Sequence, residues 1–150
     1  MSLLAAMALS GTAYADTLDC VFKKQSSNKY LPERVVFSVG QFDTHAKLHE
    51  TVISGVETHK RTAKVERNGR NALSIAWPAN EYVFTKNGRK TNRGNGYMTI
   101  NMDTFDYSVF VDKRSMQAKV RFEDTRYLHL KFNTTGACKR VDSKEKGKNG

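Results

Sequence analysis

The sequence predicts an all-β protein, a single-domain antiparallel β-barrel or β-sandwich of about nine to eleven short strands. From Met116 to Glu123 apolar and polar side chains alternate strictly, as in a half-buried strand. Turn-forming residues recur at intervals near ten positions, the spacing of all-β folds. The two cysteines, Cys20 and Cys138, stand near the two ends of the predicted β domain. A disulfide that joins the first strand to the last would favour a closed barrel.

The first strands are read from short alternating runs. Thr17 to Lys23 places Leu18, Cys20 and Phe22 on one face, and a second strand begins with Val35, Phe37 and Val39. Residues Gln41 to Gly55 are ambiguous, because they combine a short helical stripe with the β-branched residues of Thr51 to Val56. We predict a strand there.

Two Asn-Gly pairs mark the middle of the chain. Thr58 to Arg67 and Ala72 to Trp77 flank Asn68 and Gly69, and Asn-Gly between extended runs predicts a β-hairpin. Glu81 to Lys86 is a further predicted strand, followed by a second such turn at Asn87 and Gly88.

The last third predicts a four-strand antiparallel meander from Tyr97 to Cys138. Its apolar sets are separated by polar turns at 103–106, 112–115 and 124–126. The sets are Met98, Ile100 and Met102, then Tyr107, Val109 and Val111, then Met116 to Phe122, then Leu128, Leu130 and Phe132.

The N-terminus predicts a cleaved signal peptide over residues 1–15. An apolar run from Leu3 to Leu9 is followed by Ala13, Tyr14 and Ala15, the small-x-small pattern of a cleavage site. No Lys or Arg precedes the run, so the true start codon is either Met1 or a position upstream of it. The alternative to a signal peptide is an N-terminal helix packed on the domain. We expect a β domain over 16–141, a disordered basic tail over 142–150, and no transmembrane segment after cleavage.

Cys20 and Cys138 predict a structural disulfide in an oxidising compartment. The alternative is two separate buried thiols. Together with the leader, the cysteines predict a periplasmic or secreted location.

The net charge of +10 is concentrated in residues 60–93, which hold nine basic and two acidic residues. Glycines and asparagines near these cations allow backbone amides to face an anion. The expected partner is an anionic polymer or a phosphorylated envelope component, with nucleic acid less expected in an exported protein. The alternative is solvated hairpin ends that keep the protein soluble. The candidate binding residues are Arg67, Arg70, Lys86, Arg89, Lys90 and Arg93.

Catalytic and metal-binding patterns are weak. His45, His49 and His59 do not follow a zinc-protease motif, and no Gly-x-Ser-x-Gly sequence is present. Aspartate is a preferred turn residue, so the acidic residues near the predicted turns are expected to form them. These acids are Asp103, Asp106, Asp112, Glu123 and Asp124. We therefore expect a protein that is not an enzyme and holds no cofactor and no metal.

The frame of the chain resembles small exported all-β proteins of uncharacterised bacterial families. The resemblance consists of the leader, Cys20 soon after it, and the closing segment Thr135 to Lys139. It implies no known activity. A weaker resemblance is to periplasmic lysozyme inhibitors, which are small disulfide-tied β-barrels. Their signature segments are not matched, and a basic chain would be repelled by a basic lysozyme.

These observations predict an exported binding protein that contacts an anionic partner through basic hairpin tips. The alternative is a periplasmic inhibitor or assembly partner that docks another protein through an apolar patch near Trp77, Tyr82 and Tyr97. A core or rim position for Trp77 is expected ahead of a stacking platform.

Overall fold

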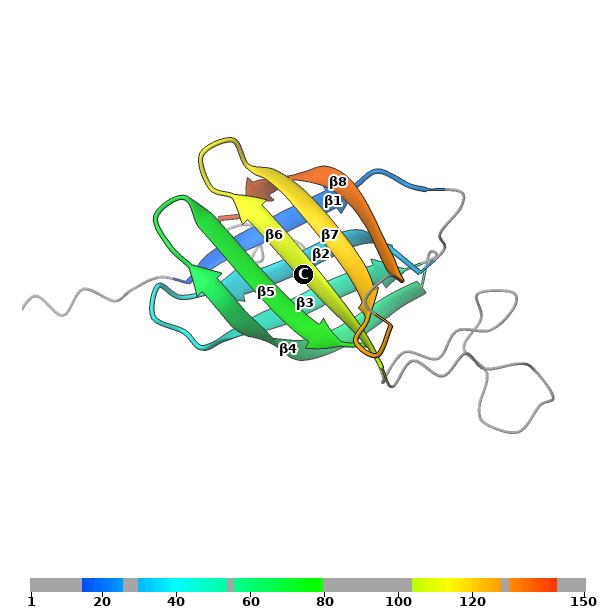
Figure 1. The fold of residues 1–150 in the computed structure, drawn as a ribbon. Helices are drawn as coiled ribbons and strands as arrows, with labels where there is room; N and C mark the ends of the chain where they lie inside the picture. Colours follow the sequence, from blue (N-terminus) through cyan, green and yellow to red (C-terminus); the bar gives the residue numbers. More distant parts are fainter. Residues whose placement is uncertain (1–14, 26–29, 54–55, 80–103, 128–129, 143–150) are drawn as a thin grey trace, which may run out of the picture.

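The computed structural model describes residues 15–25, 30–53, 56–79, 104–127 and 130–142, with only the backbone for 56–60. These residues form a closed antiparallel barrel in which each strand pairs with the next and β1 pairs with β8 (Figure 1). The predicted all-β fold is confirmed, and the closed order decides for the barrel over the sandwich. The strands are β1 (Asp16–Phe22), β2 (Pro32–Val39), β3 (His45–Ile53), β4 (Val56–Asn68), β5 (Ala72–Pro78), β6 (Phe105–Asp112), β7 (Gln117–Asp124) and β8 (Lys131–Arg140).

The described residues thus contain eight strands, close to the predicted number. The predicted strands near Glu81 to Lys86 and Met98 to Met102 lie outside the described residues, as do the leader at 1–14 and the end of the tail at 143–150. In the part of the chain that the structure describes, no helix is long and apolar enough to span a bilayer.

The core fills the inside of the barrel, because alternate residues of each strand point inward. Trp77, Tyr107 and Phe122 are at most 2% exposed. The ring of Tyr107 stacks on Trp77 with centroids 5.6 Å apart and lies 5.0 Å from Phe122. The expected core position of Trp77 is confirmed. Other buried side chains include Leu18, Val35, Phe37, Val39, Leu48, Ile53, Leu73, Ile75, Val109, Val111 and Val120.

An irregularity in β3 explains why the stretch from Gln41 to Gly55 is ambiguous in sequence. Phe37 pairs with Leu48 and Val36 pairs with Glu50, so His49 is an extra residue on β3. Such a β-bulge shifts the inward phase by one position. Ala46 and Leu48 are buried before it, and Thr51 and Ile53 after it. The predicted strand is therefore correct, but its period is interrupted.

β1 and β8 close the barrel with backbone pairing and a disulfide. Cys20 lies directly opposite Cys138, and their sulfur atoms are bonded across a sequence separation of 118 residues. The predicted disulfide is confirmed, and it is typical of proteins that fold outside the cytoplasm. In the same pair of strands Gly136 faces Phe22. A Cβ atom at Gly136 would lie 2.0 Å from the Val21 carbonyl oxygen, so a side chain does not fit there.

Three details of the predicted meander need correction. β6 begins at Phe105, so Asp106 is part of a strand and not of a turn, and Glu123 is its partner within β7. β8 begins at Lys131 and not at Tyr127, and it continues to Arg140.

The predicted role in a turn is confirmed for Asp112 and Asp124. Their Oδ1 atoms accept backbone hydrogen bonds from Arg114 and from Arg126, at 2.8 and 2.9 Å. Asp103 lies outside the described residues.

Candidate functional site

A cavity of about 490 Å³ opens at one end of the barrel. The turns β2–β3, β4–β5 and β6–β7 lie at this end, on the left in Figure 1, beside the start of β1 and the end of β8. The volume falls within the range of about 300–1,000 Å³ typical of small-molecule sites. Its lining residues are Asp16, Leu18, Val39, Gln41, Asn68, Gly69, Arg70, Leu73, Lys113, Met116 and Arg140.

Several charged lining residues lie two positions along the chain from an inward-facing residue, and therefore on the same side of the strand. Asp16 precedes inward-facing Leu18, Lys113 follows inward-facing Val111, and Arg140 follows inward-facing Cys138. Arg140 also lies opposite Leu18 in the β1–β8 register, which places both residues on the same side of the sheet. The charged mouth is therefore an extension of the strand periodicity that builds the apolar core.

The side chain of Asn68 links the three turns of this end. Its Nδ2 atom donates to the carbonyl oxygens of Gly40 and Gln41 at 3.2 and 3.4 Å, and its Oδ1 atom accepts a hydrogen bond of 2.5 Å from Lys113 Nζ. A second contact joins the β4–β5 and β6–β7 turns, because Lys113 N donates to the Asn71 carbonyl oxygen at 2.9 Å. These bonds fix the Lys113 ammonium beside the cavity.

Met116 contributes an apolar side chain to the cavity from an unusual backbone conformation. Its φ angle is 58°, in the left-handed region that costs a non-glycine residue about 1–2 kcal/mol. The turn holds it there, since Met116 N donates to the Asp112 carbonyl oxygen at 2.7 Å and Cys138 N donates to the Met116 carbonyl oxygen at 2.8 Å. Leu18, Val39 and Leu73, all at most 5% exposed, complete the apolar floor.

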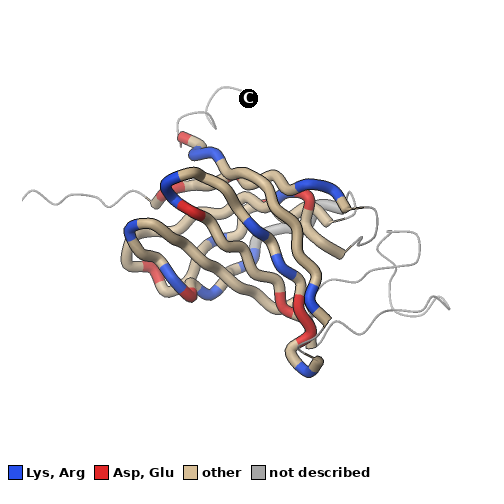
Figure 2. The backbone as a smooth tube through the Cα atoms, turned by 45° about the horizontal axis from the view of Figure 1, so that its top comes forward, with Lys and Arg blue, Asp and Glu red and all other residues tan. Residues whose placement is uncertain are grey.

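The cavity lining contains three cations and one carboxylate. Arg70 belongs to the β4–β5 turn, Lys113 to the β6–β7 turn and Arg140 to the end of β8, while Asp16 is the acid. Basic segments stand at the turns of this end in Figure 2. Three cations converging from three separate segments favour a negatively charged ligand over a cation.

The structure describes two of the six sequence-predicted binding residues, and only one of these two lines the cavity. Arg70 lines the cavity. Arg67 is an exposed residue of β4 opposite Ser74 and does not line the cavity. Lys86, Arg89, Lys90 and Arg93 lie outside the described residues. The described residues that flank them, Ala79 and Thr104, are at the opposite end of β5 and β6 from the cavity.

Sequence reasoning missed Lys113 and Arg140. Lys113 lies in the stretch 94–138, where six basic residues are nearly balanced by five acidic ones, and Arg140 stands just before the basic tail over 142–150 that we expect to be disordered. Extending the inward alternation to the last residue of β8 and to one residue past β6 would have found both.

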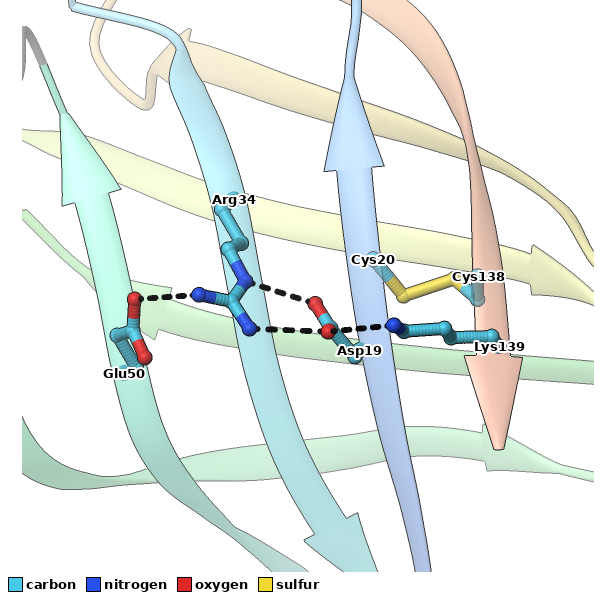
Figure 3. A network of polar contacts seen from close by, with 6 residues as sticks. All are labelled: Asp19, Cys20, Arg34, Glu50, Cys138 and Lys139. Atoms are coloured by element: carbon cyan, nitrogen blue, oxygen red, sulfur yellow. Dashed lines mark hydrogen bonds and ion pairs between the residues drawn. A yellow bond between two sulfur atoms is a disulfide. The ribbon is translucent and has the colours of Figure 1, made fainter. Parts of the chain in front are cut away.

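A second group of charged residues crosses the outer wall of the barrel (Figure 3). Lys139 of β8, Asp19 of β1, Arg34 of β2 and Glu50 of β3 form a continuous row of ion pairs. Asp19 is only 5% exposed. Hydrogen bonds from Arg34 hold the pKa of the Asp19 carboxyl below its ordinary value, although burial alone would raise it. Every charge in this row has a partner within the row, which indicates a structural role.

A serine–histidine pair lies on the same outer wall. Ser38 Oγ and His49 Nε2 are 2.8 Å apart, within the range of an activated nucleophile. Neither residue lines the cavity, so the pair lacks a substrate pocket that the structure describes. His45 contacts Thr44, the side chain of His59 lies outside the described residues, and no group of three metal ligands occurs among the side chains that are described.

The alternative apolar docking patch loses one of its three members. Trp77 is 2% exposed and lies inside the barrel, and Tyr82 and Tyr97 lie outside the described residues.

No family model matches the chain, and no curated protein and no solved structure is detectably similar to it.

Proposed function

We propose that this protein is an exported, non-enzymatic binding protein for an anionic partner, located in the periplasm or outside the cell. One observation carries the proposal. Arg70, Lys113 and Arg140 come from three separate segments and line one cavity, in which Asp16 is the single carboxylate among the described lining residues.

The position of the cations inside a concave site separates them from basic residues that serve solubility. Solubility requires charge dispersed over a surface, and Lys47, Lys64 and Lys119 on the outer wall meet that requirement. Cations gathered around one cavity focus their field on an entering anion. The disulfide supports an oxidising location for the site.

Binding to an immobilised polyanion tests the proposal. Wild-type protein should be retained on dextran sulfate and not on neutral dextran, and retention should weaken steeply as salt rises. The triple variant Arg70→Ser, Lys113→Ser, Arg140→Ser should elute at clearly lower salt. The matched control Lys47→Ser, Lys64→Ser, Lys119→Ser has the same net charge as the first triple variant. It should elute at clearly higher salt than that variant does.

Equal elution of the two triple variants would show that net charge alone governs retention, and the cavity would then have no special role. A third variant, Arg89→Ser, Lys90→Ser, Arg93→Ser, tests the basic segment predicted from sequence. If only this variant loses retention, the anionic partner binds there and not at the barrel mouth.

A further inference from the structure

We infer that the ligand of the barrel mouth is an amphipathic anion, an acidic head group that carries a short apolar chain. This inference rests on the proposed function, because the same three cations would hold the head group. It adds the class of the ligand, which the charges alone do not define.

The apolar floor of the cavity provides for the chain. Leu18, Val39 and Leu73 line the same cavity as the three cations, and Leu18 lies directly opposite Arg140 in the β1–β8 register, so apolar and cationic groups stand side by side. Apolar surface next to a few converging polar groups is the usual composition of small-molecule sites. A purely polar polyanion would leave this floor in contact with water.

The depth of the cavity limits the chain. Behind the floor the barrel interior is filled by Phe37, Ile75 and Val109, none of which is exposed. A long chain cannot pass through this packed layer. The site therefore suits a chain of moderate length or a compact apolar group.

The backbone of Met116 gives a second, independent indication. A glycine or an asparagine would occupy its left-handed conformation with less strain, yet this position carries a long apolar side chain that lines the cavity. Strained residues that line a binding site are often held for function. A flexible thioether is also well suited to adapt to an apolar ligand.

Phe42 presents a further apolar group near the rim. It is 86% exposed in the β2–β3 turn, next to the lining residue Gln41. The same ligand chemistry can come from a free amphiphile or from a lipid in a membrane, and an exposed aromatic ring next to cations suits contact with an anionic lipid surface.

Calorimetric titration with three probes tests the ligand class. Octyl phosphate has both parts, inorganic phosphate has only the head group, and octyl glucoside has only the chain with a neutral head. We expect one molecule of octyl phosphate to bind at a concentration below its micellar threshold, with affinity at least about tenfold above that of either other probe. Equal binding of inorganic phosphate, equal binding of octyl glucoside, or no binding of octyl phosphate would overturn the inference.

Variants then locate the binding. Met116→Gly removes the apolar side chain while glycine fits the backbone, so octyl phosphate affinity should fall roughly fivefold with the melting temperature and circular dichroism retained as evidence of folding. Asp16→Asn removes the only carboxylate among the described lining residues and should raise affinity. Phe110→Ser, an exposed residue on the outer wall of β6, is the control and should leave affinity unchanged. Wild-type affinity in both Met116→Gly and Asp16→Asn would place the ligand elsewhere.

The outcome separates this inference from the proposed function. If dextran sulfate retention depends on Arg70, Lys113 and Arg140 but octyl phosphate does not bind, the anion-binding function stands and the amphipathic ligand is wrong. If octyl phosphate binds, competition by phosphatidylglycerol vesicles supports a membrane lipid as its source, and lack of competition supports a free amphiphile. Phe42→Ser should weaken only the vesicle interaction.

Discussion

Arg34 donates two parallel hydrogen bonds to Asp19, from Nε to Oδ1 and from Nη2 to Oδ2, each 2.9 Å long. This paired geometry joins β2 to β1 on the outer wall, next to the strand pair that closes the barrel. Bidentate arginine–carboxylate contacts are among the stronger hydrogen bonds in proteins. The carboxylate of Asp19 is nearly inaccessible to solvent, so the loss of its charge should be felt in stability.

Replacement of Asp19 by Asn should lower the free energy of unfolding at pH 7 by about 1–3 kcal/mol, because Arg34 loses a charged acceptor. The folded-state pKa of Asp19 lies below its ordinary value. Its contribution is therefore present above about pH 4, the unfolded-state pKa, and is lost as pH falls through the lower folded-state pKa. Urea unfolding of both proteins between pH 2 and 7 measures this. A stability difference that stays constant over that range would contradict the assignment.

The contribution of Asp106 to stability should depend on pH in the opposite way, so this aspartate is a control for Asp19. Burial, with Glu66 and Glu123 nearby, raises the pKa of its carboxyl. The native state therefore binds the proton more tightly than the unfolded state, and stability decreases as pH rises through the unfolded-state pKa toward the higher folded-state pKa. Asp106→Asn should raise the melting temperature slightly at pH 7 and have almost no effect near pH 3. A lower melting temperature at pH 7 would show that the carboxylate makes a stabilising contact.

Reduction of the disulfide should destabilise the barrel without abolishing its strand pairing. Closing a loop between Cys20 and Cys138 stabilises by up to about 5 kcal/mol in the chain-entropy model, while the β1–β8 hydrogen bonds remain. We expect the reduced wild type and the variant Cys20→Ala, Cys138→Ala to unfold at similar, lower urea concentrations than the oxidised protein. Thiol alkylation followed by mass spectrometry of protein from its native compartment checks the bond itself. Labelling without reductant would contradict it.

The fold was predictable because its signals are local. The alternation from Met116 to Phe122 and the turn at Asn68 and Gly69 both fall where the structure places β7 and the β4–β5 hairpin. The failures have local causes as well. The bulge at His49 shifts the period within β3. The start of β8 was misplaced because Leu130 and Phe132 are spaced like residues on one face of a strand, although Leu130 precedes β8.

The candidate site was less predictable, because it is assembled by barrel closure. Arg70, Lys113 and Arg140 are separated along the chain and line one cavity because the barrel brings the β4–β5 turn, the β6–β7 turn and the end of β8 to the same end. A count of charge by segment emphasises 60–93 and includes Arg70, but it cannot show which end of the barrel each cation occupies. The direction of a strand decides at which end of the barrel a cation lies, and its place in the alternation decides whether it faces inward. Both are known only once the strand pairing is known.

Gly136 should be among the positions least tolerant of a side chain. An alanine Cβ would lie 2.0 Å from the backbone oxygen of Val21, so β1 or β8 would have to move and the closing hydrogen bonds would weaken. Gly136→Ala should destabilise by about 3 kcal/mol or more. Gly69→Ala is the matched control, since its nearest contact would be 3.8 Å away and its effect should stay within about 0.5 kcal/mol. Similar denaturation midpoints for the two variants would refute the close approach of the closing strands.

Asn68 should control the shape of the cavity mouth more than any other uncharged side chain in its turn. It donates to the carbonyl oxygens of Gly40 and Gln41 and accepts from Lys113. Among the described residues, the side chain of neighbouring Asn71 has one partner, Arg114, from which it accepts a hydrogen bond of 3.0 Å. Asn68→Ala should therefore lower stability by about 1–2 kcal/mol, and Asn71→Ala by about 0.5 kcal/mol or less.

The two alanine variants should also differ in how the turns move. Loss of the Asn68 bonds frees the β2–β3 turn, so the amide of Asp43, which donates to the Gly40 carbonyl oxygen, should exchange its hydrogen faster. It also releases the Lys113 ammonium from its fixed place, and retention on dextran sulfate should weaken although no charge has been removed. Hydrogen exchange and salt elution of both variants measure these effects. If Asn71→Ala alters them as much as Asn68→Ala does, the three turns are held together by their backbones and not by the Asn68 side chain.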